Sequence, residues 1–599
     1  MRTKWFGVVS LLIVAGLILA ACAPAAGTPV VQTVIVEGEV MVVTATPETE
    51  AAGPKVLRYF FGPGDVPTLD PGLATDTTSV QIDNMAFVGL TYLDEVAVKL
   101  YPGMAESWDV SEDGLTYTFH LVQGIPWVKY DGTEVVQVMD CQETPAPRML
   151  TAHDFEYGIK RAVAPETASD YAYVLGFAIQ GANEYNAGEA TADDVGVKAI
   201  DDYTLEVKFL ENVAYNTNII GLWTARAVPK WLIEGDDCTD ARGDKWTETG
   251  FFQGYGPYTL KEWIHDTSIT MIKNPFWPGI ENLGVSKLDE VTFSMLDDVP
   301  AFAEYEAGNL DVGPVPLADI DRVKADPVLS AEYEQSPSLC TYYYGFNTKA
   351  PFVDDARVRR ALSMAIDRQS LIDNVTKGGQ EPAQWFARPG LVAAPTMDGY
   401  PDLGVKYDAA AAKALIDEYL AEKGITAADV DITLMFNTSS GHQKIAEAIQ
   451  QMWRDNLGIE VKLTNQEWQV FLDTIRDPVA TPQIYRLGWC LDYPDANNFT
   501  REVFVDGGSA NPSEGGGINY KPGDGNYDEF ERILLAAATE QDPDKRTDMY
   551  AQAEEILVDT DAVMAPIYWY TSLSVTKPYV QRTYGQVQHQ EFTTWDITQ

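Results

Sequence analysis

The chain has 599 residues, more than a single hydrophobic core usually serves, so two or three domains are expected. Hydrophobic residues make up 46% and charged residues 22%, as in an ordinary globular protein. The formal net charge of −47 argues against nucleic acid or an anionic membrane surface as a partner. It favours a soluble, self-repelling protein that works outside the cytoplasm.

The N-terminus predicts export. Arg2 and Lys4 precede an apolar run at 6–21 that is too short for a typical membrane-spanning helix, so residues 1–22 are interpreted as a secretory signal. The run ends in L-A-A-C, which is similar to the lipobox at which bacterial lipoproteins are cut and lipidated, here on Cys22. No other run is long enough to span a bilayer, so lipid alone would anchor the protein. A simple signal peptide with a chance cysteine is the alternative.

Residues 23–55 predict a flexible tether. They are rich in Ala, Pro, Thr, Val and Glu, and fully extended they would reach about 100 Å. A β-branched run at 30–36 favours a hairpin around Glu37 and Gly38.

Folded sequence is expected to begin with a short strand at 55–60. An apolar helical stretch then follows and extends through Phe87, Leu90 and Tyr92. A turn at 113–114 precedes an alternating strand at 116–121, and Thr151 caps a helix that runs to about residue 162.

The second half predicts helices and parallel strands. Asp354 or Asp355 caps a helix with one apolar face, formed by Val358, Ala361, Leu362, Ala365 and Ile366. A strand at 431–436, a helix at 442–456 closed by Gly458 and a strand at 459–463 form a βαβ unit, which indicates a parallel sheet. A short helix at 468–475 leads to the next strand.

That next strand, which starts at Ile484, ends beside a carboxylate. Pro494 cannot join a sheet ladder, so Asp492 falls just past the carboxyl end of the strand, where ligands bind in open α/β sheets. Together with Arg486 and Trp489 it offers both signs of charge and an aromatic wall, which suits a zwitterion. The alternative is that Asp492 caps a turn and Arg486 lies on the surface.

The sequence lacks the usual catalytic and metal-binding motifs. There is no H-E-x-x-H, C-x-x-C, G-x-S-x-G, P-loop or G-x-G-x-x-G, so neither a metal nor a cofactor is predicted. A secreted hydrolase is the rival from another class, but it would need a nucleophile and a base that the sequence does not reveal. The five histidines share no helix turn: His120, His153, His265, His442 and His589.

Ordered blocks of sequence identify a family. They are P-G-M-A-E-S-W at 102–108, T-A-H-D-F-E-Y-G-I-K-R at 151–161, G-P-Y-T-L-K-E-W at 256–263, L-C-T-Y-Y-Y-G-F-N-T at 339–348 and D-A-R-V-R-R-A-L-S-M-A-I-D-R at 355–368. With them the chain resembles the extracytoplasmic oligopeptide-binding proteins of bacterial ABC importers over about residues 56–599. The resemblance implies a two-lobe α/β periplasmic-binding-protein fold with mixed sheets and an additional inserted subdomain.

The implied domains are discontinuous. Lobe I would comprise 56–88, 212–339 and 572–599, the inserted subdomain 89–211, and lobe II 340–571. By the same resemblance the protein would be a monomer and not an enzyme, capturing oligopeptides by lobe closure and delivering them to the permease subunits. Relatives with this fold bind oligosaccharides, nickel, haem or opines, so another solute is the alternative.

The resemblance also implies the binding residues. Asp492 matches the aspartate that binds the peptide α-ammonium. The cations implied for the peptide carboxylate are Arg486, Arg476 and His442. The implied aromatic contacts are Trp468, Trp489 and Tyr171. In the alternative interpretation, His442 only starts a helix, Arg476 is solvated and the tryptophans belong to the core.

Besides Cys22, four cysteines remain, and an even number in an oxidising compartment favours disulfides over metal. Sequence alone permits three pairings, and four free thiols are the alternative. The resemblance implies a bridge between Cys340 and Cys490, because both match bridged family cysteines, and this leaves Cys141 and Cys238 for the second bridge.

Overall fold

The computed structural model describes residues 31–36, 39–44, 53–587 and 589–598. The predicted signal peptide at 1–22, with its lipidation site Cys22, lies outside the described residues, as does much of the tether at 23–55. Within the tether, β1 (Val31–Val36) and β2 (Glu39–Thr44) pair antiparallel, as the predicted hairpin requires. Among the described helices, none has the length and apolar character needed to cross a membrane.

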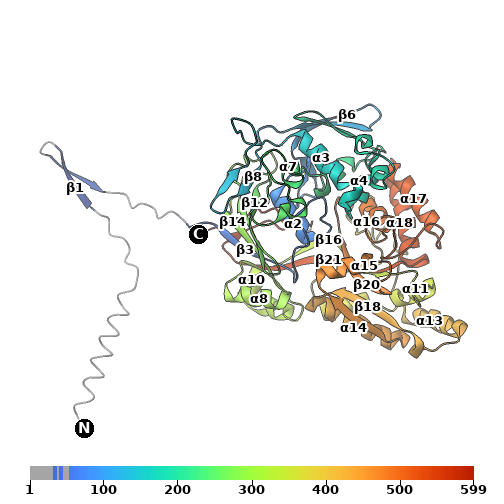
Figure 1. Ribbon diagram of the computed structural model, residues 1–599. Helices are drawn as coiled ribbons and strands as arrows, with labels where there is room; N and C mark the ends of the chain where they lie inside the picture. Colours follow the sequence, from blue (N-terminus) through green and yellow to red (C-terminus); the bar gives the residue numbers. More distant parts are fainter. Residues whose placement is uncertain (1–30, 37–38, 45–52, 588, 599) are drawn as a thin grey trace, which may run out of the picture. The chain divides into compact units, whose positions relative to one another are not determined.

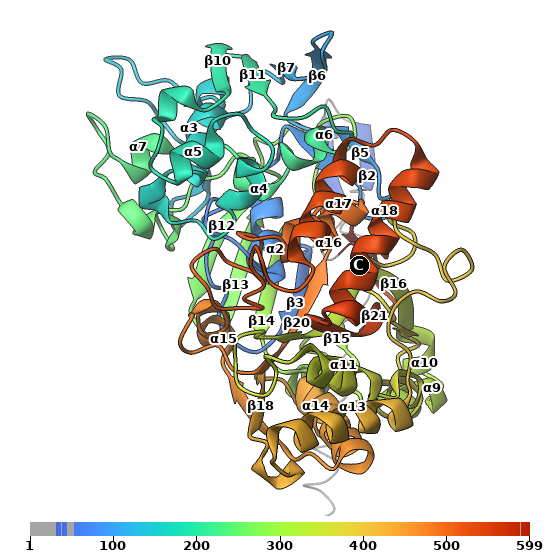
Figure 2. The ribbon, with the colours of Figure 1, turned by 90° about the vertical axis from the view of Figure 1, so that its right-hand side faces the viewer.

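Residues Lys55–Thr598 form one compact unit, drawn in Figures 1 and 2. Its first sheet has four strands, with β14 parallel to β3 and antiparallel pairing elsewhere. In spatial order these are β12 (Tyr258–Ile264), β13 (Ser268–Lys273), β14 (Glu290–Met295) and β3 (Val56–Phe61).

The helix after β3 is shorter than the sequence predicts. α2 (Thr77–Ala86) starts at its N-cap Asp76 and ends at Ala86, so the prediction that it extends through Phe87, Leu90 and Tyr92 is wrong. The carbonyl oxygen of Gly89 accepts a hydrogen bond from the Met104 amide at 2.7 Å, and β4 (Thr91–Leu93) pairs with β5 (Leu100–Pro102). Backbone pairing with this neighbouring segment overrides the helical pattern of apolar residues.

A second sheet lies within the predicted inserted subdomain, in the order β10-β11-β7-β6. Figure 2 shows it at the top of the unit, with α13 and α14 at the bottom and β3, β14 and β20 between them. Its elements are β6 (Ala105–Val110), β7 (Thr116–Leu121), β10 (Val197–Asp201) and β11 (Thr204–Lys208), and nearby lie α3 (Ala152–Ala162) and α4 (Ala172–Gly176). Thr151 begins α3 with a capping box, as predicted.

The largest sheet has seven strands and mixed direction. β18 runs parallel to β19 and to β20, and α14 connects β18 with β19, which confirms the predicted βαβ unit. The main path is β15 (Val312–Pro314), β21 (Met564–Thr576), β16 (Tyr333–Phe346), β20 (Ile484–Cys490), β18 (Ile432–Asn437) and β19 (Val461–Gln466), with β17 (Glu381–Pro382) beside β21.

Helices pack around this sheet. The sequence predicts Asp354 or Asp355 as the cap of α11, and the structure has Asp355 as the N-cap. The predicted apolar face from Val358 to Ile366 is buried. The main helices of this half are α11 (Ala356–Met364), α13 (Ala409–Lys423), α14 (Ser440–Leu457), α15 (Trp468–Arg476), α16 (Ala496–Phe504), α17 (Tyr527–Thr539) and α18 (Pro543–Glu555).

Two long strands connect the predicted lobes. β16 and β21 pair antiparallel from the Tyr333–Val575 pair to the Gly345–Met564 pair, with two register shifts between. The predicted boundaries at residues 340 and 571 fall inside these strands. One continuous sheet therefore extends across both boundaries and provides the base from which β20 leads to the candidate site.

Candidate functional site

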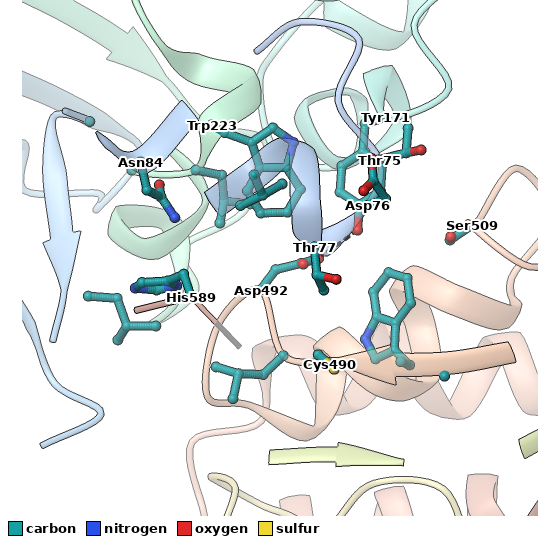
Figure 3. A pocket seen from close by; sticks show the side chains of 18 of the residues that line it. Thr75, Asp76, Thr77, Asn84, Tyr171, Trp223, Cys490, Asp492, Ser509 and His589 are labelled. Carbon is teal, nitrogen blue, oxygen red and sulfur yellow. Dashed lines mark hydrogen bonds between the residues drawn. The ribbon is translucent and has the colours of Figure 1, made fainter. Parts of the chain in front are cut away.

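A cavity of about 300 Å³ is lined by segments that are far apart in the sequence. One wall comes from α2 and the turn before it, and another from β20 and the loop that follows, at 486–492. Tyr171, Trp223, α15 and residues near the C-terminus complete the lining (Figure 3). The volume falls at the lower end of the range for small-molecule sites.

Asp492 lies on this wall, two residues past the end of β20. Its backbone amide donates to the Asn498 side chain at 2.9 Å, and the Asn498 amide donates back to Asp492 Oδ2 at 3.0 Å. The Tyr171 hydroxyl donates to the same oxygen at 3.1 Å. The start of α16, which carries Asn498, thus fixes the carboxylate, and Oδ1 accepts no hydrogen bond from the described residues.

The charge of Asp492 has no counter-ion within the part of the chain that the structure describes. Burial raises the pKa of its carboxyl to about 7, although hydrogen bonds from Asn498 and Tyr171 favour the ionised form. A ligand cation next to Oδ1 would stabilise the carboxylate that burial disfavours.

Aromatic side chains stand beside this carboxylate. The Tyr171 and Trp489 rings are stacked with centroids 6.5 Å apart, and Trp223 lies 5.2 Å from Tyr171. The Trp489 indole donates to Asn498 at 3.2 Å. Trp468 lines the cavity from the first turn of α15, half-buried and stacked on Phe471. Of the predicted aromatic residues, all three therefore line the cavity.

Arg486 lines the same cavity and is only 7% exposed. Its Nη1 donates to Asn437 Oδ1 at 3.0 Å, and Nη2 donates to the Tyr570 hydroxyl. The guanidinium lies 4.5 Å above the Tyr342 ring. Among the described residues, Nε has no hydrogen-bond partner and no carboxylate forms an ion pair with this side chain, so a buried positive charge lies at the cavity without an anion.

Of the two other predicted cations, Arg476 lines the cavity and His442 does not. His442 starts α14 outside the cavity lining, with Nδ1 3.4 Å from the Tyr342 hydroxyl, and burial together with Arg486 holds its pKa well below the usual value. A neutral imidazole supplies no charge. Arg476 does line the cavity, but its Nη1 is ion-paired with Asp170 Oδ2 at 2.5 Å.

Several lining residues escaped the sequence analysis. Asp76 is buried, with Oδ1 capping α2 and Oδ2 unpartnered within the described chain. The D-T-T-S run at 76–79 is typical of a helix start and could have indicated Asp76 as a capping residue. No local pattern marks the others, because they meet only through tertiary packing: Thr75, Asn84, Arg226, Ser509, His589 and Glu591.

Two disulfides match the pairings that the family resemblance implies. Cys340 and Cys490 are register partners on β16 and β20, with Cα atoms 4.0 Å apart. The bridge therefore joins the strand that leads to Asp492 to its neighbour.

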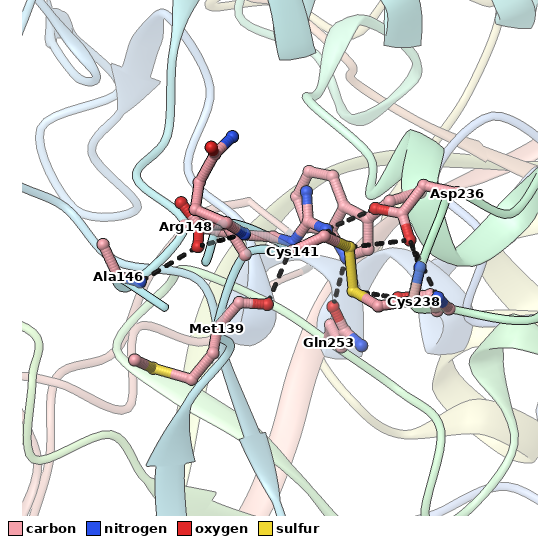
Figure 4. The surroundings of a disulfide bond; sticks show 11 residues. Met139, Cys141, Ala146, Arg148, Asp236, Cys238 and Gln253 are labelled. Carbon is pink, nitrogen blue, oxygen red and sulfur yellow. Dashed lines mark hydrogen bonds and ion pairs between the residues drawn. A yellow bond between two sulfur atoms is a disulfide. The ribbon is translucent and has the colours of Figure 1, made fainter. Parts of the chain in front are cut away.

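Cys141 and Cys238 link two exposed loops, with Cα atoms 5.7 Å apart (Figure 4). Arg148 ion-pairs with Asp236 beside this second bridge and stacks on Trp231. These contacts lie outside the cavity lining.

Comparison with protein families gives one match that covers more than half of the chain. Residues 99–511 match the middle region of the bacterial extracellular solute-binding proteins, family 5. The oligopeptide-binding protein OppA of Bacillus subtilis is 34% identical over 517 residues, which are 84% of this chain and 86% of that protein.

Solved structures are similar to the fold over most of the chain. The Haemophilus influenzae OppA in complex with the peptide RPPGFSPFR gives a TM-score of 0.77 at 26% identity, covering 91% of this chain and 99% of that one. The unliganded open form of the murein tripeptide-binding protein MppA gives only 0.58, at 28% identity and 91% and 98% coverage. Another structure of MppA gives a TM-score of 0.77 at the same 28% identity, covering 91% of this chain and 99% of that one. The lower score therefore reflects the open conformation, and this structure differs from that open form.

Proposed function

Because the chain belongs to family 5 of the bacterial extracellular solute-binding proteins, we propose that it captures oligopeptides outside the cytoplasm and delivers them to the permease of an ABC importer. The observation that carries this proposal is Asp492, a cavity-wall carboxylate with a free oxygen and no cationic partner among the described residues. Members of this family are solute-binding proteins and not enzymes. The similarity to the oligopeptide-binding protein OppA of Bacillus subtilis, and to an OppA in complex with a peptide, supports peptides over sugars or metal complexes.

Each end of a peptide would meet a group of opposite charge. Asp492 would bind the α-ammonium, with the Tyr171 hydroxyl holding the carboxylate in place. Arg486 would bind the peptide carboxylate, which supplies the anion that this buried guanidinium lacks. Trp468 and Trp489 would form walls for side chains.

The two other predicted cations receive lesser roles. Arg476 would hold the cleft closed through Asp170, since its charge is already matched. His442 would act only as a neutral hydrogen-bonding group near Arg486.

Capture would proceed by closure of the two lobes. The peptide backbone pairs with strand edges, which gives affinity independent of side chains. Water in the side-chain pockets adapts to each residue and keeps the site permissive. The ligand shifts an equilibrium between open and closed forms, and the permease recognises the closed form.

The proposed setting is the outer face of the cell membrane. Cleavage before Cys22 and lipidation of that residue would anchor a monomer through the tether at 23–55. Mass spectrometry of the N-terminal fragment purified from the host membrane tests the anchor: a diacylated Cys22 is expected, and an unmodified N-terminus would contradict it.

Isothermal titration calorimetry with a tripeptide and its amino-terminally acetylated analogue tests the peptide assignment. Binding of the free amine is expected, with a loss of about 3–5 kcal/mol on Asp492→Ala, because the desolvated ammonium is then orphaned. Asp473→Ala, at an exposed acid on α15, is the matched control. Tight binding of the acetylated peptide, or unchanged affinity of the Asp492 variant, would refute the assignment.

A further inference from the structure

A second buried guanidinium, that of Arg226, lines the cavity. Arg226 is 7% exposed and follows the short turn Trp223–Ala225. Its Nη1 donates to the Phe87 carbonyl oxygen, and its Nη2 donates to Asn84 Oδ1 at 2.9 Å. Both contacts fix the planar group against α2 and the residue after it, while Nε has no partner among the described residues.

No acid in the described chain neutralises Arg226 by an ion pair. Asp83 attracts Arg226 electrostatically without forming an ion pair with it, and it is fully buried with neither carboxyl oxygen hydrogen-bonded among the described residues. Burial holds the pKa of Asp83 well above its usual range and therefore favours its neutral form. An unpaired buried guanidinium costs several kcal/mol, so an anion brought by the ligand would be favourable here.

The other titratable groups on this side of the cavity do not supply that anion. Burial and the nearby Arg226 lower the pKa of His589 to about 4, so the imidazole is neutral at pH 7. Glu591 accepts hydrogen bonds from the amide and hydroxyl of Thr593 and does not contact Arg226. Asn84, which holds the guanidinium, is an uncharged acceptor.

Arg226 is separate from the groups proposed for the peptide termini. In Figure 3, Asn84 and His589 lie at the left of the cavity, whereas Tyr171 and Ser509 lie at the right and Asp492 is between them. Arg486 belongs to β20, on the wall contributed by the large sheet. When Asp492 and Arg486 hold the two ends of a peptide, Arg226 would thus remain as a further cation on the cavity wall, and an anionic side chain of the peptide could pair with it.

We infer that Arg226 and Asn84 form a subsite for an acidic side chain, so that the protein prefers peptides that carry Asp or Glu at one position. The inference rests on the proposed function, since it requires a bound peptide. Arg226 acts as a specificity-determining residue, because a charged guanidinium that can only donate hydrogen bonds favours a carboxylate over the amide of equal shape.

Calorimetry with three pairs of tripeptides tests this inference. Each pair carries Glu or Gln at the first, second or third position of an otherwise all-Ala peptide. At one position the wild-type protein is expected to bind the Glu peptide about 10- to 100-fold more tightly than the Gln peptide, from the strength of charged hydrogen bonds. In Arg226→Gln this ratio should fall to about one, whereas Arg226→Lys should keep part of it.

Asn84→Asp is a second variant that leaves Arg226 in place. The new carboxylate occupies the acceptor position of the Asn84 amide and neutralises the guanidinium, so the Glu preference should again disappear. Because the readout is a ratio within one variant, a general loss of affinity does not affect it. Melting temperatures establish that each variant is folded.

The outcomes are distinct. No Glu preference at any position in the wild-type protein, or a preference that survives Arg226→Gln, would overturn the inference. Carboxyl-terminally amidated peptides form another arm: if Arg226→Gln weakens only the non-amidated forms, Arg226 binds the main-chain carboxylate and the subsite is refuted. If no peptide binds at all, the proposed function fails instead.

Discussion

At the scale of single residues, the ionisation of Asp492 predicts the pH dependence of binding. Burial raises the pKa of this carboxyl to about 7, and only the ionised form can pair with an ammonium. The carboxylate predominates above that pKa and is lost below it, so affinity should decrease as the pH falls, by up to about tenfold per unit below 7.

Calorimetry between about pH 8 and pH 5 measures this slope. In Asp492→Asn the affinity should be lower at every pH but nearly independent of it. The same steep slope in that variant would assign the pH dependence to another group.

Arg486 gives a second prediction at this scale. Arg486→Gln removes the cation proposed for the peptide carboxylate, so binding of a free tripeptide should weaken by about 1.5–3 kcal/mol. Binding of the carboxyl-terminally amidated tripeptide should be weak in the wild-type protein and change little on substitution. A double-mutant cycle over protein and peptide isolates the pair. Equal losses for both peptides would place the peptide carboxylate elsewhere.

At the scale of elements, the bridge between Cys340 and Cys490 predicts a link between stability and binding. It ties β20 to β16 at a register pair, two residues before Asp492. The sequence separations of the two bridges are 150 and 97 residues, so chain entropy predicts a similar stabilisation of up to about 5 kcal/mol for each.

Paired Cys→Ala variants distinguish the two bridges. Urea unfolding should show a comparable loss of stability for both. Only the Cys340 and Cys490 variant should also lose peptide affinity, since the bridge between Cys141 and Cys238 lies outside the cavity lining. If the two variants have the same peptide affinity, the bridge between Cys340 and Cys490 has no specific role in positioning the Asp492 loop.

Elements also show what sequence reasoning can reach. The βαβ unit around α14 and the apolar face of α11 were predictable, because their periodicity is local and the caps Asp355 and Gly458 are explicit. The end of α2 was not, since the β4–β5 pairing that stops the helix depends on a later segment, where Thr91 pairs with Pro102 and Leu93 with Leu100.

The same limit applies to the site. Asp492 could be found because it follows a strand and precedes Pro494, which are neighbours in the sequence. Arg226 could not, because it meets Asn84 across 142 residues and stands in a turn without a motif. The ion pair of Arg476 with Asp170 spans 306 residues, so the sequence could not reveal that this cation is already matched.

At the scale of the whole molecule, contacts between the predicted inserted subdomain (89–211) and predicted lobe II (340–571) would favour a closed form. Arg476 meets Asp170, and Tyr171 meets Asp492. Tyr215, in predicted lobe I, stacks on Tyr493 with ring centroids 5.2 Å apart. These contacts agree with the lower similarity of the structure to the open form of MppA than to the other MppA structure.

Removing the ion pair should therefore shift the equilibrium toward the open form. The Asp170 side chain is 55% exposed, and exposed pairs are worth about 0.2–1 kcal/mol, so Asp170→Asn should weaken peptide binding by no more than about fivefold. Arg476→Gln should have the same effect, and the double variant should be no worse than either one. Small-angle scattering at subsaturating peptide should show a larger radius of gyration in all three. If instead Arg476→Gln costs far more than Asp170→Asn, and amidation of the peptide abolishes the difference, then Arg476 binds the peptide carboxylate directly and its pairing with Asp170 gives way to the ligand.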